Sequence, residues 1–200
     1  LITGTADVTI GGANGSSDNG NEIAGHTSHG VEIGDGVKTA TIAGNYIGVV
    51  EDYDQTSNKY IVDGGNDGAG VYVDSASSSL TDVTIGGSSA ALMNRIAANN
   101  ANAIHVVDAG ATPANVTVQN NSIGVGQDDT TDLGNTGVGV LIADGNTVTV
   151  SDNAILNSSS DGVRLTGGVA ATIRGNRIGN NASSATASNG GHGIHVNSSV

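Results

Sequence analysis

The sequence predicts an all-β solenoid in which short parallel strands stack in successive coils. Three short apolar signatures recur in a fixed order along the whole chain. One complete period takes only 23 residues, the separation between Val150 and Ile173 in the first signature. The apolar residues are almost all Val, Ile and Ala, with no Phe or Trp, which suits narrow strands around a thin interior. A repeat this short cannot bury its own interior, whereas stacked repeats can.

Each signature has its own residue pattern. The first places a Thr between two apolar residues, at Thr9, Thr41, Thr84, Thr117, Thr149 and Thr172. The second is Asn-x-Ile, at Asn21, Asn45, Asn94, Asn121, Asn153 and Asn176. The third is an apolar pair around one variable residue, and it begins at Val31, Val71, Ile104, Val140, Val163 and Ile194. Three signatures that each occur six times predict 18 strands with alternating inward and outward side chains. We number the coils 1 to 6 by these occurrences.

Together these strands predict a single-stranded parallel β-helix of about six coils. On these signatures the whole chain resembles the right-handed parallel β-helix repeat proteins of the pectate-lyase-like superfamily, of a non-catalytic repeat type. The right hand is implied by this resemblance and agrees with the general preference for right-handed crossovers. We expect residues 1–200 to form one such domain. Because Leu1 is not an initiator Met and both ends fall inside the repeat, we expect a fragment of a longer repeat protein.

Two rows of polar side chains are expected along the coils. The six Asn of the second signature should stack at one turn, where each amide can bond the amides above and below it. The six Thr of the first signature should face outward. A flat Thr row resembles the β-helical ice-binding proteins, but Asp7 and Ala170, two residues before the first and last Thr, show that no matching second row accompanies it. We therefore interpret the Thr row as exposed strand residues with high β-propensity.

Long loops leave one corner of every second coil, and those of coils 2 and 4 are rich in acidic residues. They span residues 49–70, 124–137 and 179–193. Such loops either stay mobile, bind something, or pack on one another across coils. Oxygen-rich loops with Gly are what Ca²⁺ requires, and solvated acidic loops are the alternative. The candidate calcium ligands are Asp52 and Asp54 in coil 2, and Asp128, Asp129 and Asp132 in coil 4. No other cofactor is expected.

The outward row of the third strand is the candidate carbohydrate-binding face. It reads Glu32, Tyr72, His105, Leu141, Arg164 and His195. In the polysaccharide lyases and hydrolases that this chain resembles, such a face floors the substrate groove, which implies Tyr72, His105, Arg164 and His195 as carbohydrate-binding residues. However, His105 and His195 stand three coils apart, about 14 Å. No two carboxylates adjoin on this row, as glycoside hydrolysis requires. We therefore predict no catalytic residue and favour a protein that is not an enzyme.

Two pairs of histidines and a group of arginines are further candidates for a zinc site and for a lyase site. His26 and His29, and likewise His192 and His195, have H-x-x-H spacing, which gathers ligands on a helix but lets them diverge on a strand or turn. Zinc is therefore not expected. The arginines of coils 5 and 6, including Arg177, are expected to lie away from the acidic loops, which argues against a composed lyase site.

Charge and composition limit the partners. The chain has 6 basic and 19 acidic residues and a formal net charge of −13, which disfavours nucleic acid and anionic lipid as partners. No apolar run approaches the roughly 20 residues that cross a membrane, so membrane insertion is not expected. The Asn-, Thr- and Gly-rich, Lys-poor composition is typical of an exported protein, either secreted or on the cell surface.

Two functions follow from this reading of the sequence. The first is an extracellular structural or adhesive module of a surface protein or filament. Such a module associates with itself, head to tail or laterally, because uncapped coils expose strand edges. The alternative is a carbohydrate-active enzyme or polysaccharide-binding module of the same fold, whose partner is a cell-surface polysaccharide.

Overall fold

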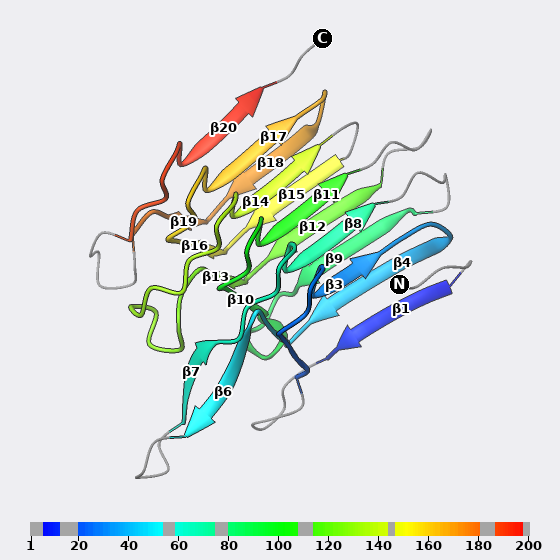
Figure 1. Cartoon of the computed structure of the whole chain (residues 1–200). Coiled ribbons are helices and arrows are strands. Elements are labelled where there is room, and N and C mark those ends of the chain that lie inside the picture. Colours follow the sequence, from blue (N-terminus) through cyan, green and yellow to red (C-terminus); the bar gives the residue numbers. More distant parts are fainter. Residues whose placement is uncertain are drawn as a thin grey trace.

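The computed structural model is a parallel β-helix built from three six-stranded sheets (Figure 1). It describes residues 6–12, 20–53, 59–74, 80–107, 114–143, 147–180 and 187–197. The first sheet contains β1 (Ala6–Gly11), β4 (Val37–Ala43), β9 (Asp82–Gly86), β12 (Asn115–Gln119), β15 (Thr147–Ser151) and β18 (Ala170–Arg174). The second contains β2 (Glu22–Ile23), β5 (Tyr46–Ile47), β10 (Arg95–Ile96), β13 (Ser122–Ile123), β16 (Ala154–Ile155) and β19 (Arg177–Ile178). The third contains β3 (Val31–Ile33), β8 (Val71–Asp74), β11 (Ile104–Val107), β14 (Val140–Ala143), β17 (Val163–Thr166) and β20 (Ile194–Asn197).

The three sheets correspond to the three sequence signatures, which confirms the 18 predicted strands and the all-β fold class. Every neighbouring pair within these sheets is parallel, and equivalent residues face each other in register. Thr117, for example, pairs with Thr84 on one side and Thr149 on the other. The six Thr of the first signature therefore form one continuous row on the outer surface, as predicted.

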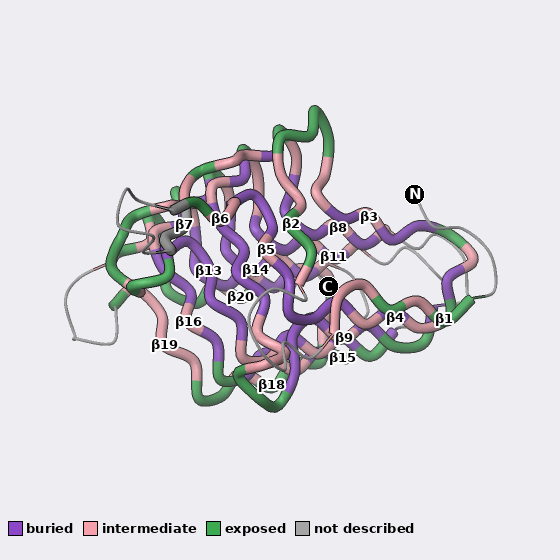
Figure 2. Tube along the Cα trace, turned by 90° about the horizontal axis from the view of Figure 1, so that it is seen from below, coloured by how far each residue is buried: buried purple, intermediate pink, exposed green. Residues whose placement is uncertain are grey.

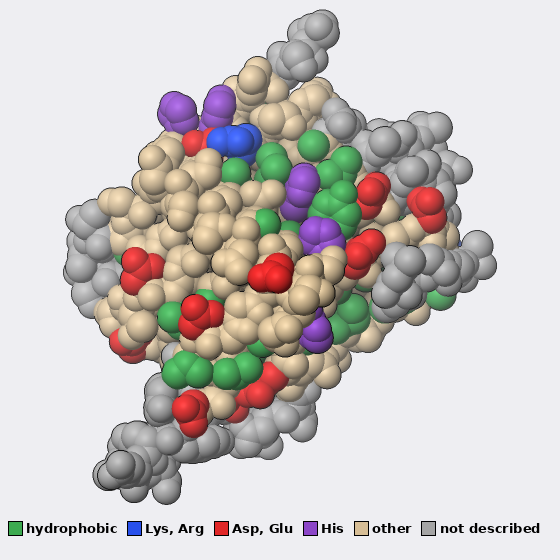
Figure 3. All heavy atoms as spheres, in the orientation of Figure 1, with side chains coloured by type: hydrophobic (Ala, Val, Ile, Leu, Met, Phe, Trp, Pro, Cys, Tyr) green, Lys and Arg blue, Asp and Glu red, His purple; other side chains and the backbone are tan. Residues whose placement is uncertain are grey.

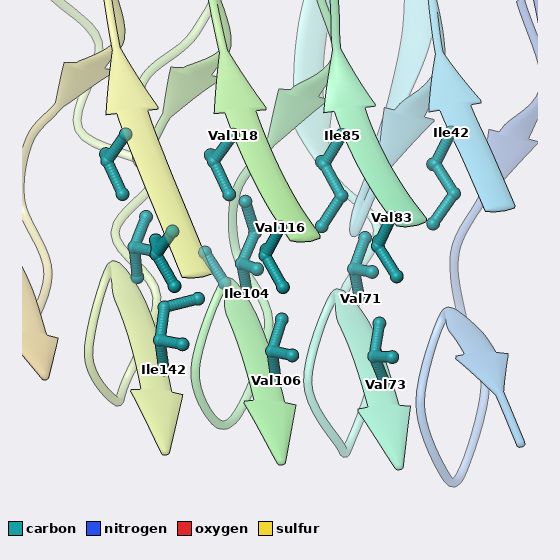
Figure 4. Packing of buried hydrophobic residues seen from close by; sticks show 14 of the residues in the cluster. Ile42, Val71, Val73, Val83, Ile85, Ile104, Val106, Val116, Val118 and Ile142 are labelled. Atoms are coloured by element: carbon teal, nitrogen blue, oxygen red, sulfur yellow. The ribbon is translucent and has the colours of Figure 1, made fainter. Parts of the chain in front are cut away.

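The core is a narrow column of aliphatic side chains that runs through all coils. Figure 2 shows where along the chain the buried residues lie. Strand residues alternate between buried and partly exposed, as in β11 and β14. Figure 4 shows Val116 and Val118 of the first sheet pointing toward Ile104 and Val106 of the third. Each fully buried Val or Ile contributes about 1.5 to 3 kcal/mol to stability, so the interior needs no aromatic side chain.

The predicted Asn ladder is present at the turn before the second sheet, and its four inner members, Asn45, Asn94, Asn121 and Asn153, are buried. The Nδ2 atom of Asn94 donates to the Oδ1 atom of Asn121 over 2.9 Å, and Asn121 donates to Asn153 over 3.0 Å. The same bond joins Asn21 to Asn45, Asn45 to Asn94 and Asn153 to Asn176. Asn121 Nδ2 also donates to the backbone carbonyl of Gln119. One carboxamide thus donates hydrogen bonds both to the backbone of its own turn and to the Asn of the next coil.

A second buried ladder, which the sequence analysis missed, lies at the corner before the third sheet. Asn66 Nδ2 donates to Asn99 Oδ1 over 2.8 Å, and Asn99 Nδ2 donates to Asn135 Oδ1 over 2.9 Å. Coil 6 supplies Asn189, whose Oδ1 accepts the backbone N–H of Ser158 over 2.9 Å. In coil 5 the slot holds Ser158, and its buried Oγ atom has no hydrogen-bond partner within the part of the chain that the structure describes. The sequence signal is a residue five positions before each third signature, occupied by Asn in four of six coils.

The long loops of coils 2 and 4 begin at glycines with left-handed backbone angles. Gly48 and Gly124 both have φ of +81°, and a Cβ atom at either one would collide with a carbonyl oxygen of the next coil. After Gly48 the chain forms an antiparallel hairpin of β6 (Val49–Tyr53) and β7 (Lys59–Asp63). Val49 packs with Ala97 and with Leu133 of the coil 4 loop in a small cluster beside the main core. Of the alternatives left open for the loops, the structure therefore shows packing across coils for these two.

Helical structure is scarce in the described residues. They contain a single 3₁₀ turn, η1 (Ala90–Leu92), and no α-helix. None of their helices has the length and apolar character that a membrane crossing requires.

We predict that Ser158→Asn stabilises the protein. An Asn in this slot supplies a carboxamide between Asn135 and Asn189 and completes the second ladder. One net hydrogen bond raises the free energy of unfolding by about 1 kcal/mol. The measurement is the urea midpoint of unfolding, followed by circular dichroism.

The matched variant is Asn135→Ala, which breaks the same ladder one coil earlier. It removes the acceptor of both the Nδ2 and the backbone N–H of Asn99, bonds of 2.9 and 3.0 Å. Because these donors stay buried, we expect a loss of roughly 2 kcal/mol. If Ser158→Asn lowers the urea midpoint, the second ladder does not act as described.

Candidate functional site

The residues predicted to bind carbohydrate align in one row on the third sheet and fall into two groups, and carbohydrate binding by them stays a prediction. Tyr72 pairs with His105, and Arg164 pairs with His195, in adjacent strands. Leu141 stands between the two groups, opposite His105 on one side and Arg164 on the other. The face in view in Figure 3 carries histidine side chains along the length of the β-helix. The two groups need to be considered separately.

Tyr72 lies at the centre of an aromatic stack along the helix axis. The ring of His29 stacks on it with centroids 4.3 Å apart and an interplanar angle of 15°, and His105 meets it edge-on at 5.2 Å. Its hydroxyl donates to an Asp74 carboxylate oxygen over 3.2 Å. Burial, followed by the negative charges of Asp74 and Glu32, raises the pKa of Tyr72. His29 was not among the predicted residues, and it covers one face of the ring on which a sugar would stack.

Arg164 and His195 meet at a buried carboxylate that the sequence analysis did not select. Asp161 is 2% exposed, and its Oδ2 atom accepts a hydrogen bond of 2.6 Å from Arg164 Nε and lies 3.0 Å from His195 Nδ1. Its Oδ1 atom accepts the backbone N–H of His192 over 2.7 Å and lies 3.1 Å from the Nδ1 atom of that residue. Four groups thus converge on one carboxylate.

These contacts decide the ionisation of the carboxylate. Burial by itself raises the pKa of Asp161, but the N–H of His192, the Arg164 guanidinium and the two imidazoles lower it further than burial raises it. The net effect is a pKa below the usual range. Asp161 therefore carries a full negative charge inside the corner of the β-helix.

The expectation that the His192/His195 pair diverges is wrong. Their ring centroids are 4.8 Å apart at a tilt of 45°. The reason is that His192 lies in the turn before β20, directly over Asp161 in the coil below, while His195 points outward from β20 itself. Together with Asp161 they form the one group of three His, Cys, Asp or Glu side chains in the described residues whose donor atoms lie within 4.8 Å of one another. The sequence signal was the slot two residues before the third signature, which holds His29, Asp161 and His192.

Hydrogen bonds to local groups occupy the acidic residues of the coil 4 loop. Asp128 accepts from the hydroxyls and N–H groups of Thr130 and Thr131, and its pKa is lowered by the Thr130 hydroxyl first and the Thr131 N–H next. Asp132 accepts the N–H of Gly134 over 3.0 Å. Asp52 lies on β6, and Asp54 falls outside the described residues. Calcium binding by this set stays a prediction.

The expected separation of Arg177 from the acidic loops is also wrong. Asp129 lies 3.7 Å from Arg177 of coil 6 and 3.7 Å from Arg95 of coil 3. Arg95 also bonds the backbone of this loop, since its Nη1 atom donates to the carbonyl of Gly126 over 2.6 Å. Burial lowers the pKa of Arg95, and the neighbouring Asp129 opposes this shift. The coil 4 loop therefore lies against the second sheet and reaches coil 3 on one side and coil 6 on the other.

A groove of about 250 Å³ opens beside this contact. Its lining includes Met93, Asn120, Ser122, Asp129, Asp152 and Arg177. It follows the outside of the first Asn ladder, because most of these residues directly precede or follow a ladder Asn. The groove brings two carboxylates and one guanidinium to a surface that spans coils 3 to 6.

Comparison with known families decides the identity of the fold. A family model described as the right-handed β-helix region matches residues 52–200. The chain belongs to the right-handed β-helix family. This agrees with the resemblance drawn from the three signatures and gives the β-helix its hand. No curated protein and no solved structure matches this β-helix.

We predict that His105 of this β-helix titrates below its ordinary pKa of 6.5. Burial of the imidazole is the main cause, charge on His29 adds to it, and Asp74 opposes both. Because the folded pKa is lowered, neutral His105 contributes stability above a pH of about 6.5, and this contribution is lost as the pH falls through the folded pKa. An NMR titration of the imidazole resonances measures the midpoint.

Two neighbours provide opposite controls for this titration. His29→Ala removes the repelling charge, so the midpoint of His105 should rise, whereas Asp74→Asn removes the attracting charge and should lower it. A His105 midpoint at or above 6.5 in the unmodified protein would contradict this environment.

Proposed function

We propose that this β-helix is a structural module of an exported surface protein or filament, and that its end coils stack head to tail on further coils of the same kind, within a longer chain or in a second copy. The single observation that carries the proposal is the apolar cross-section of coil 6. Ile194 and Val196 are 48% and 65% exposed, and they are the exposed large hydrophobic residues among the described residues. In every preceding coil the equivalent side chains of the third sheet are buried.

The strand edges of coil 6 support the same proposal. β18, β19 and β20 each form the edge of a six-stranded sheet. At the opposite edges lie β1, β2 and β3, which carry the same three signatures. The coil 1 edge of a second copy therefore offers the apolar spacing and the parallel strands that coil 6 requires, at the usual strand separation of about 4.8 Å. The exported location rests on the Asn-, Thr- and Gly-rich composition.

The test is electron microscopy with sedimentation velocity on the purified protein. We expect concentration-dependent rods or filaments, and we expect Val196→Asp to abolish them because it places a charge in the contact. The matched control is Thr117→Asp, which adds the same charge on the outer row of the first sheet, away from both ends. Rods of single-molecule length at every concentration, for the unmodified protein, would refute stacking.

A second candidate function, a polysaccharide-binding or polysaccharide-cleaving module, rests on the groove along the first Asn ladder. Arg177 presents a guanidinium, which binds the carboxylate of a uronate in a two-pronged contact, and Asp129 and Asp152 present acceptors for sugar hydroxyls. The groove runs across several coils, which suits an extended chain rather than a single sugar.

Acidic and neutral polysaccharides distinguish this candidate in a binding and cleavage screen. We expect Arg177→Ala to weaken binding of a polyuronate by at least about tenfold, the usual cost of a charged hydrogen-bond pair. Arg174→Ala is the control, since this residue lies on β18 and not among the groove residues. Equal binding by the two variants would remove the groove as the site.

A further inference from the structure

We propose that Asp161, His192 and His195 form a binding site for a divalent transition metal of the zinc class. The inference concerns the corner of coils 5 and 6 alone, and it does not depend on stacking or on the groove. It replaces the expectation from sequence that His192 and His195 diverge on a strand or turn and that zinc does not bind.

The geometry fits a small, tetrahedral ion. In a tetrahedral zinc site with bonds of about 2.0 to 2.1 Å, neighbouring donor atoms are about 3.3 to 3.4 Å apart. The two Nδ1 atoms stand 3.1 and 3.0 Å from the two oxygens of Asp161, and all three donors lie within 4.8 Å of one another. A modest rotation of the exposed imidazoles brings both nitrogens and one oxygen around a common centre.

Two lone-pair sites of the carboxylate face the imidazoles. Each carboxylate oxygen offers two lone-pair sites. One site on Oδ1 accepts the N–H of His192, and one on Oδ2 accepts Arg164 Nε. The remaining sites face the two imidazoles, which donate protons to them when the metal is absent. When the ion binds, each neutral imidazole carries its proton on Nε2 instead, both Nδ1 atoms and one carboxylate oxygen bind the ion, and the His192 N–H and Arg164 Nε keep their bonds to Asp161.

The carboxylate of Asp161 is already held in a fixed orientation, and the two histidines leave one side of the site open to solvent. Asp161 is buried and held by the main chain, and Arg164 is in turn held by the Ser160 hydroxyl over 3.0 Å. Such a partner fixes the orientation of a ligating carboxylate. The side chains of His192 and His195 are 71% and 36% exposed, so the fourth position of the ion faces solvent. In Figure 3, two histidines stand beside an acidic and a basic side chain at one end of the face in view.

The donor set selects the class of metal. Two imidazole nitrogens and one carboxylate oxygen suit Zn²⁺, Co²⁺, Ni²⁺ or Cu²⁺, whereas Ca²⁺ takes six to eight oxygens. The positive charge of Arg164 beside the carboxylate further disfavours a hard cation that is held by charge alone. The site is therefore distinct from the predicted calcium ligands of the coil 2 and coil 4 loops.

The experiment is isothermal titration of tag-free protein with Zn²⁺, and with Ca²⁺ for comparison. We expect one Zn²⁺ per chain and no Ca²⁺ at this site. The double variant His192→Ala/His195→Ala should lose the zinc equivalent, while His26→Ala/His29→Ala, the other H-x-x-H pair, should keep it. Both pairs are on the surface corner of a coil, so the second variant controls for the loss of two histidines.

A second readout identifies the ligands directly. X-ray absorption of the zinc-loaded protein should show nitrogen and oxygen neighbours at about 2.0 to 2.1 Å with the outer-shell pattern of two imidazoles. Zn²⁺ should also raise the melting temperature of the unmodified protein and not that of the His192→Ala/His195→Ala variant. Equal zinc binding by the two double variants, or no binding by the unmodified protein, would overturn the assignment.

Discussion

The buried Asn ladder is the interaction on which the rest of this structure depends. A carboxamide carries a donor and an acceptor, so the same residue type can bond its equivalent in the coil above and in the coil below. Asn121 does this and also bonds the carbonyls of Ile85 and Gln119 with its own Nδ2 atom. Because a buried amide without partners is costly, every coil must present its Asn at the same height and in the same orientation. This requirement fixes the register of all three sheets.

Because the register is fixed, residues at equivalent positions of successive coils lie side by side in the structure. Residues that are 23 to 49 positions apart in the chain become neighbours along a row, as the ladder contacts show. Loops can then differ in length without disturbing the rows, provided that they leave at a residue such as Gly48 or Gly124 that tolerates the left-handed turn. The chemistry of this β-helix therefore gathers at its corners and along its outer rows, where His29 reaches Tyr72 and His192 reaches Asp161.

The sequence predicts the contacts that the strand pattern decides. The pairing of Tyr72 with His105 follows from period-2 alternation and the coil period alone. The sequence does not predict the contacts that turns and loops make at the corners of the coils. His192 and His195 were expected to diverge, and only the turn geometry shows that His192 lies over Asp161 beside His195. Arg177 was placed away from the acidic loops because the path of the coil 4 loop against the second sheet has no signature in the sequence.

The sequence by itself determined the strands, their order in three sheets, the inward aliphatic residues and the first Asn ladder. These features follow from the alternation of inward and outward residues within a strand and from the recurrence of the signatures in every coil. Both patterns can be recognised from the spacing of residues in the sequence. The tertiary structure alone decided the second ladder, the hairpin of coil 2, the ion pairs of Asp129 and the convergence on Asp161. Those features depend on the backbone conformation of turns and on packing between coils, because a turn can aim the same side chain in several directions while a strand can aim it in only two.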